Sequence, residues 1–297
     1  MERQRAISLA LLVTFLWSTS WVLIKLGLRE SLPPLSFAGL RYMLAWLCLA
    51  PLVFFNQERR EQLRQLGWRD WAWLVALGLV YYALTQGTQY LSLDLLPAAL
   101  VSLLLNLTPV VVAAGGLIFL GERPGRLQWL GLLVTLAGVL IYFQTGALPR
   151  SQWLGIGAAL LCLVANAASS VMGRKVNRDG RLPVLLVTFV SMGVGAVVLL
   201  LVGGVTQGFG ALSFRHWLVI TWLALVNTAL AFTLWNISLR VLSAVESSIL
   251  NGLMLPQIAI LAWVFLDEAL SVREISGLGL VCLGVILVQV RGWRGGR

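Results

Sequence analysis

Two stretches of sequence decide the fold: LGERPGRLQWLGLLVTLAG at residues 120–138 and LDEALSVREISGLGLVCLG at residues 266–284. Each carries a glutamate followed by two glycines at the same spacing: Glu122, Gly131 and Gly138, then Glu268, Gly277 and Gly284. The copies lie 146 positions apart in a chain of 297 residues, and each follows an apolar segment that holds a proline. A repeat of this length predicts one unit of about half the chain, duplicated and fused.

The composition indicates that this chain lies in a membrane. Apolar residues make up 59% of it and charged residues only 11%, with a mean hydropathy of +0.88, whereas soluble domains carry about 25% charged residues. A helix needs about 20 apolar residues to cross the hydrocarbon layer. Ten stretches qualify: residues 6–26, 34–55, 71–91, 97–120, 127–144, 152–172, 183–204, 217–239, 245–266 and 274–291. Their unbroken apolar runs exclude a transmembrane barrel, which would alternate apolar and polar residues. We therefore predict an all-α integral membrane protein.

The basic residues predict the orientation. If the N-terminus is cytoplasmic, sixteen Lys and Arg residues lie at cytoplasmic span ends and five at the other side, with Arg41 left inside a span. This is a strong positive-inside bias, so we expect a multi-pass protein of the bacterial inner membrane with both termini cytoplasmic. The net charge of +10 then needs no nucleic-acid partner, because cations at helix ends face the headgroups of the lipid bilayer.

The repeat predicts two units, residues 1–146 and 147–297, of five spans each. Because five is odd, the second unit enters the membrane in the opposite orientation, and the two units form inverted repeats around a central cavity. Many secondary transporters alternate access with this architecture.

The chain also resembles a known family. The run Leu120–Pro124 after a proline-bearing helix, and Trp17–Trp21 followed by Lys25, Pro33 and Arg41, are similar to the EamA repeat of the drug/metabolite transporter superfamily. The second half is less faithful, with Asp267 before the glutamate. The resemblance implies a ten-helix carrier whose cavity is lined by helices one, three, four, six, eight and nine. It also implies that helices five and ten pack at the back or mediate a homodimer. The aromatic-rich composition is similar to the YddG-like aromatic amino acid exporters.

Polar and aromatic side chains that recur every three or four positions in a span indicate a stripe turned away from lipid. Tyr82, Gln86 and Tyr90 form such a stripe, and Asn227 and Trp235 take matching positions in the second half. The predicted substrate-binding residues are Trp17, Tyr82, Gln86, Tyr90, Ser102, Asn106, Asn166, Asn227, Trp235 and Asn251. The alternative for any single Asn or Ser is that it only bonds to a neighbouring helix. Pro109 and Pro256 are predicted hinges, because proline removes a helical hydrogen bond and bends the helix.

The charged residues narrow the function further. No carboxylate falls at mid-membrane, and a proton-coupled carrier normally has a titratable group along its path. We therefore expect a facilitative or weakly coupled exporter of small amphipathic metabolites, including aromatic amino acids. A carrier of drugs, cations or phosphorylated metabolites and a proton-coupled antiporter are the alternatives. Arg41 either snorkels outward or attracts a substrate carboxylate, and we expect the structural role.

The sequence favours no enzymatic chemistry. The three cysteines, Cys48, Cys162 and Cys282, lie singly in separate spans, so neither a disulfide framework nor a metal site is indicated. Phosphate-loop and paired-histidine motifs are also missing from the sequence. We expect no cofactor and no catalytic residue.

Overall fold

The computed structural model describes residues 3–105, 107–108, 111, 125–142, 152–178, 180–266 and 271–292. The described residues form helices and turns and no strand, which confirms the all-α class. The first half holds α1 (Arg3–Arg29), α2 (Pro34–Phe54), α3 (Gln57–Arg64), α4 (Trp68–Leu77), η1 (Gly78–Thr85), α5 (Gln86–Leu95), α6 (Ala98–Leu105) and α8 (Arg126–Tyr142). The second half holds α9 (Trp153–Arg178), α10 (Val184–Thr206), α11 (Phe214–Ala224), η4 (Leu225–Leu230), α12 (Ala231–Ser238), α13 (Ala244–Gly252), α14 (Met254–Leu266) and α15 (Val272–Gly292). Asn106, Pro109, Glu122 and Glu268 lie outside the described residues.

Five described helices are long and apolar enough to cross a membrane: Arg3–Arg29, Pro34–Phe54, Trp153–Asn177, Val184–Thr206 and Phe214–Ser238. Shorter apolar helices cover Trp129–Ile141, Leu250–Leu266 and Ile275–Gly284. The count of ten spans stays a prediction.

Local sequence sets where several helices begin. Pro33 and Pro183 are the N-cap residues of α2 and α10, and Pro34 occupies the first helical position of α2, where proline is favoured. Ser243 caps α13: its hydroxyl accepts from the backbone N–H of Glu246, whose carboxylate accepts from the N–H of Ser243 in return. This capping box satisfies two amides that the helix itself leaves unpaired.

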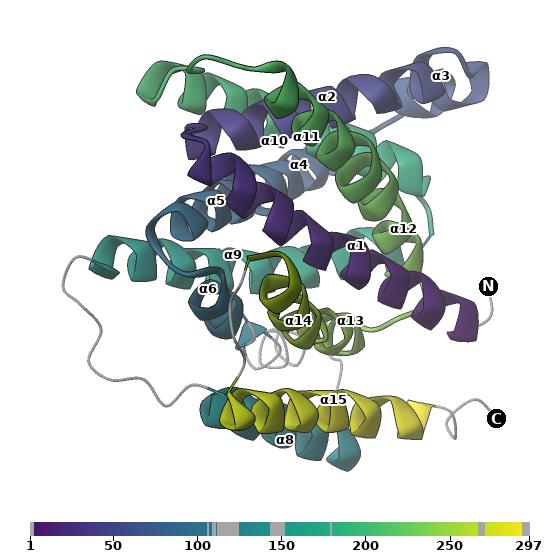
Figure 1. The fold of residues 1–297 in the computed structure, drawn as a ribbon. Helices are drawn as coiled ribbons and strands as arrows, with labels where there is room; N and C mark the ends of the chain where they lie inside the picture. The colour runs from purple at the N-terminus through teal and green to yellow at the C-terminus, as the bar shows by residue number, and fades with distance from the viewer. Residues whose placement is uncertain are drawn as a thin grey trace.

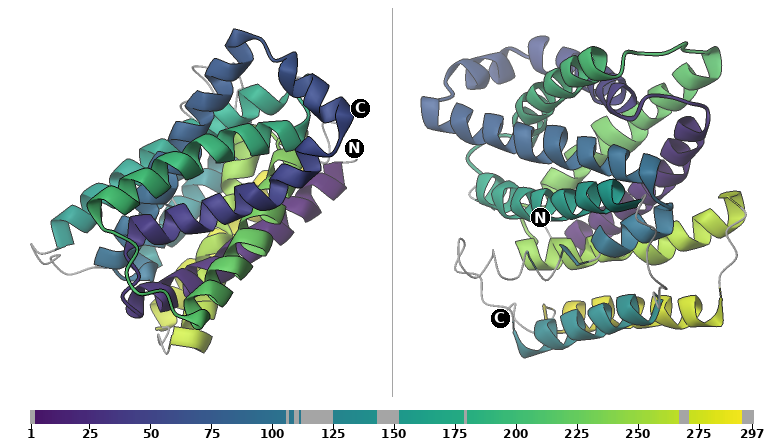
Figure 2. Two further views of the ribbon diagram at one scale, coloured as in Figure 1. Left: turned by 90° about the horizontal axis from the view of Figure 1, so that it is seen from above. Right: turned by 90° about the vertical axis from the view of Figure 1, so that its left-hand side faces the viewer.

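The duplicated glycines hold α8 and α15 together, and these two helices form a layer of their own beside the main bundle (Figures 1 and 2). A Cβ added at Gly138 would lie 2.6 Å from the carbonyl oxygen of Gly277, and one at Gly284 would lie 2.6 Å from that of Gly131. The contact is therefore reciprocal: the second glycine of each copy faces the first glycine of the other. Small residues allow this close approach of two backbones.

Within the main bundle, α2 packs along α10 in a similar way (Figure 1). A Cβ at Gly39 would lie 2.7 Å from the backbone nitrogen of Leu200, and one at Gly203 would lie 2.5 Å from that of Ser36. Each helix thus offers a glycine where the other approaches.

Two helices contain a π-helical segment. The run from Trp68 to Leu95 includes η1, and the run from Phe214 to Ser238 includes η4. In each run a threonine hydroxyl donates to the carbonyl five residues earlier: Thr85 to Val80 at 2.8 Å and Thr228 to Leu223 at 2.7 Å. Such π segments often occur at functional sites, and both of these lie next to the cavity described below.

Candidate functional site

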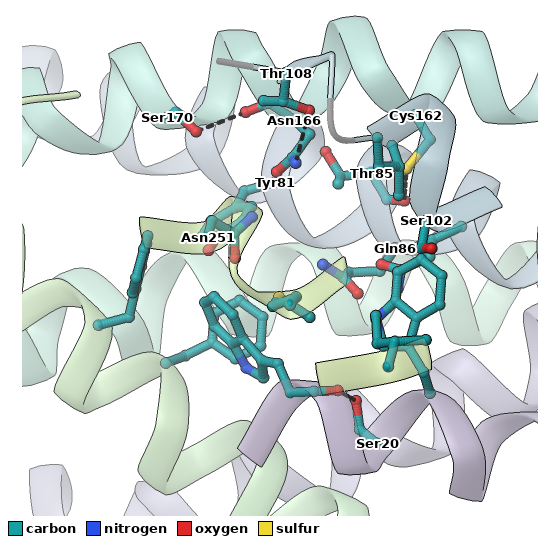
Figure 3. Close-up of a pocket in the computed structure, with 18 of the residues that line it drawn as sticks. Ser20, Tyr81, Thr85, Gln86, Ser102, Thr108, Cys162, Asn166, Ser170 and Asn251 are labelled. Carbon is teal, nitrogen blue, oxygen red and sulfur yellow. Dashed lines mark hydrogen bonds between the residues drawn. The ribbon is translucent and has the colours of Figure 1, made fainter. Parts of the chain in front are cut away.

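A cavity of about 80 Å³ lies among α1, α2, η1, α5, α6, α9, α12, α13 and α14, which is room for several water molecules. Figure 3 shows its polar side chains converging from different helices. Six predicted binding residues line it: Trp17, Gln86, Ser102, Asn166, Trp235 and Asn251. Three others, Tyr82, Tyr90 and Asn227, are buried next to it and do not belong to the lining.

Aromatic rings form one wall of the cavity. The indole of Trp17 lies 5.1 Å from that of Trp235 and 5.0 Å from the ring of Phe232, with tilted planes in both pairs. The Trp17 Nε1–H donates to the backbone carbonyl of Asn227 at 3.2 Å. Tyr81 continues the wall, with its ring 5.2 Å from Phe232. Because these contacts fix the rings, the wall is a preformed surface for a flat or apolar group.

The predicted tyrosine stripe is displaced by one residue. Tyr81, Thr85 and Gln89 line the cavity together with Gln86, whereas Tyr82 is fully buried against other rings. The reason is η1: a π segment bonds residue i to residue i+5. The five-residue spacing of the π segment places Tyr81 on the same face as Gln86, whereas α-helical spacing would place Tyr82 there.

Polar side chains form the opposite part of the lining (Figure 3). The amide of Asn166 donates to the hydroxyl of Thr108 at 3.4 Å, and the hydroxyl of Ser170 donates to the carbonyl of Asn166 at 2.9 Å. The buried Oδ1 of Asn251 has no hydrogen-bond partner. An unpaired buried acceptor is costly, so this atom is suited to accept a hydrogen bond from a ligand.

Asn227 holds helices together behind the wall. Its side-chain amide donates to the carbonyl of Leu16 and, at 3.0 Å, to the hydroxyl of Thr19, both on α1. Its backbone carbonyl accepts from Trp17 and from Arg41. The side chain thus ties η4 to α1 and supports the aromatic wall.

Arg41 does not snorkel outward, which was one of the two alternatives for this residue. It is only 2% exposed and lines the cavity. Its Nε–H donates to the hydroxyl of Thr228 at 2.7 Å, Nη1 donates to the hydroxyl of Tyr90 at 3.0 Å, and Nη2 donates to the carbonyl of Asn227 at 3.2 Å. These bonds join α2 to α5 and η4, so the residue has a structural role and faces the cavity as well.

The helix that holds Pro256 is interrupted beside the cavity. Helix α13 ends at Gly252 and α14 begins at Met254. In the turn between them the backbone N–H of Leu253 donates to the carbonyl of Leu250 at 3.1 Å. The first half has the equivalent bond 146 positions earlier, from Leu107 to the carbonyl of Leu104 at 3.1 Å.

Sequence reasoning missed several lining residues. Thr85 and Gln89 continue the helical spacing from Tyr81, and that polar stripe could have been found in the sequence. Arg41 was weighed as a carboxylate-binding residue but left off the predicted binding residues, although it carries the clearest signal, a charge inside an apolar span. Among the described residues, no group of three or more His, Cys, Asp or Glu side chains is placed to hold a metal ion.

Comparisons with known proteins agree with this architecture. The chain is 28% identical over 288 residues to the uncharacterized transporter YvbV of Bacillus subtilis, covering 95% of this chain and 92% of that protein. It is 26% identical over 301 residues to a probable amino-acid metabolite efflux pump of Salmonella typhimurium, covering 96% and 95%. A crystal structure with 20% sequence identity superposes with a TM-score of 0.79 and covers 99% of this chain and 100% of that one. The model of the EamA-like transporter family matches residues 4–144 and again residues 153–290. The chain therefore belongs to the EamA-like transporter family and is a membrane transporter.

Proposed function

We propose that this transporter exports small amphipathic metabolites, above all amino acids including aromatic ones, by alternating access. The observation that carries the proposal is the two-sided lining of the cavity. Trp17, Trp235 and Phe232 provide rings on one side, and neutral polar groups such as Gln86 and Asn251 provide hydrogen-bond partners on the other. A molecule with an apolar body and a polar head matches both sides. The Salmonella typhimurium relative named a probable amino-acid metabolite efflux pump points to the same substrate class.

The proposed transport is facilitative or weakly coupled. Among the described lining residues there is no Asp, Glu or His, which are the side chains that proton relays use in membranes. A proton-coupled antiporter is the competing mechanism. It is distinguished by whether a proton gradient drives accumulation of substrate above its outside concentration in sealed vesicles.

A carrier of phosphorylated metabolites is a weaker candidate. Phosphate recognition calls for several cations around the ligand, and in the described lining Arg41 is the single cation. Efflux of drugs or organic cations would use the aromatic wall through cation–π contacts, but the buried Arg41 disfavours a second positive charge beside it.

The proposal includes a placement in the membrane and a mechanism of motion. We place the protein in the bacterial inner membrane with both termini cytoplasmic, as the positive-inside bias indicates. Residues 1–146 and 147–297 are proposed to act as the two inverted units. Pro109 and Pro256 are proposed hinges, and the interruption before Pro256 supports this role for the second of them.

Uptake into liposomes that hold the purified protein tests the proposal. A panel of neutral, aromatic and charged amino acids is offered without any ion gradient, to the native protein and to two matched variants. Trp17→Phe changes the cavity wall, while Trp222→Phe changes a ring that is 56% exposed on the outside of α11. We expect downhill flux of aromatic and neutral amino acids that falls several-fold in Trp17→Phe and is unchanged in Trp222→Phe. Flux that is equal in both variants would mean that the pathway lies elsewhere.

A further inference from the structure

Arg41 is the one charged side chain among the described residues that line the cavity. The groups that accept its hydrogen bonds are all neutral: a threonine hydroxyl, a tyrosine hydroxyl and a backbone carbonyl. Carboxylates with a described partner lie elsewhere. Glu30 pairs with Arg215, Asp70 with Arg181, and Glu246 with Arg3.

A buried charge without a counter-charge is unfavourable. Moving an ion from water into a protein interior costs several kcal/mol even after relaxation, and an opposite charge at close range offsets that cost. Neutral dipoles such as those around Arg41 offset it in part. A membrane-embedded cation that faces a cavity is by default a functional-site hypothesis, and an anion is the ligand that would supply the missing opposite charge.

The guanidinium also has donors to spare. Arginine carries five N–H groups, and the three bonds above use one on Nε, one on Nη1 and one on Nη2. One N–H on each terminal nitrogen is left for a further partner, and a planar guanidinium matches the two oxygens of a carboxylate. The bonds to Tyr90, Thr228 and Asn227 also hold the group still, so little conformational entropy is lost when a ligand binds.

We propose that Arg41 binds the carboxylate of the substrate, so that the cavity selects small carboxylates with an apolar body over their amides and amines. This inference rests on the proposed function and adds the recognition element. The carboxylate lies at the guanidinium, and the apolar body lies against the wall that Trp17 and Trp235 form.

Calorimetric binding to the purified protein in lipid nanodiscs tests the inference. The ligands are L-phenylalanine, its carboxamide, hydrocinnamate, which keeps only the carboxylate, and phenethylamine, which keeps only the amine. Hydrogen bonds to charged groups contribute about 1.5–3 kcal/mol, so the two carboxylates should bind roughly tenfold to a hundredfold more tightly than the two ligands without one.

Three variants test whether Arg41 is the residue that distinguishes carboxylates from ligands without one. In Arg41→Gln the affinity ratio between phenylalanine and its carboxamide should fall to about one, whereas Arg41→Lys keeps the charge and should keep part of the ratio. Arg181→Gln removes a guanidinium whose side chain is 75% exposed and should leave the ratio at its native value. Thermal unfolding of each variant shows whether it is folded. If Arg41→Gln does not fold, the native ratio and that of Arg41→Lys still decide the question.

The outcomes separate this inference from the proposed function. Native protein that binds phenylalanine and its carboxamide equally, or Arg41→Gln that keeps the native ratio, would overturn the role of Arg41 and leave an amphipathic substrate in place. Native protein that binds none of the four ligands would contradict the proposed function itself, and the inference with it.

Discussion

Replacing Gly138 by alanine tests whether the duplicated glycines hold α8 and α15 together. The added methyl carbon would lie 2.6 Å from the carbonyl oxygen of Gly277 and 2.8 Å from the backbone nitrogen of Val281, where ordinary contact begins at 3.4 Å. Both partners are backbone atoms that cannot rotate away, so the helices must move apart. Overpacking of this kind costs about 1–3 kcal/mol, while alanine gains about 1 kcal/mol in helix propensity over glycine.

A matched control lies on the same pair of helices. An added Cβ at Gly279 of α15 would meet nothing within 4 Å, so Gly279→Ala should stabilise the protein by up to about 1 kcal/mol. Reversible unfolding in mixed micelles with increasing SDS measures both variants. We expect the free energy of unfolding of Gly138→Ala to lie about 1–3 kcal/mol below that of Gly279→Ala. Equal stability of the two would refute the role that we assign to the repeated glycines.

Three further predictions concern the cavity and its supports. Asn227→Ala removes the two hydrogen bonds that the side-chain amide donates to α1, to the carbonyl of Leu16 and to the hydroxyl of Thr19, so the free energy of unfolding should fall by about 1–3 kcal/mol in the same SDS titration. Tyr81→Ala should lower the flux of aromatic amino acids several-fold, whereas Tyr82→Phe, which removes a buried hydroxyl without a partner, should leave flux unchanged and the protein no less stable. If Tyr82→Phe lowered flux in liposomes and Tyr81→Ala did not, the binding stripe would run through Tyr82, as the sequence predicted. Glu246→Gln weakens both the cap of α13 and the 2.5 Å ion pair with Arg3, and a thermal melt should show a loss of about 1 kcal/mol. No change on substitution would mean that the pair contributes nothing.

The sequence predicted well those residues whose place depends on nearby sequence, and poorly those whose place depends on contacts with residues far away in the chain. The glycine spacing could be recognised because close helix contact needs small residues at fixed intervals. In the structure Gly138 lies against Gly277 and Gly284 lies against Gly131, as that rule requires. Trp17 and Trp235 could be recognised as binding residues because rings deep within a span lie away from the headgroups that anchor other tryptophans. Both line the cavity. Fold class and family followed from such patterns.

Two residues whose surroundings the sequence did not predict, Tyr82 and Arg41, share a tertiary cause. Tyr81 begins a stripe of helical spacing with Thr85 and Gln89, and Tyr82 begins another with Gln86 and Tyr90. Helical periodicity alone does not choose between the two tyrosines, and the fold around η1 turns Tyr81 to the cavity. For Arg41 the sequence predicted a structural role and left open whether the side chain snorkels outward or attracts a substrate carboxylate. The hydroxyls of Tyr90 and Thr228, remote in sequence, accept its hydrogen bonds and make burial tolerable.

Among the described residues, irregular helical backbone lies beside the cavity in both halves of the chain. Segments η1 and η4 interrupt corresponding helices, and the turns that end at Leu107 and Leu253 lie 146 positions apart. Apolar lipid cannot satisfy a backbone group that has lost its helical bond, so such breaks are stable only where protein or a water-filled cavity lies beside them. The same interruptions free carbonyls and soften the helix, so the features that shape the cavity are also the ones best able to bend in the alternating access that we propose.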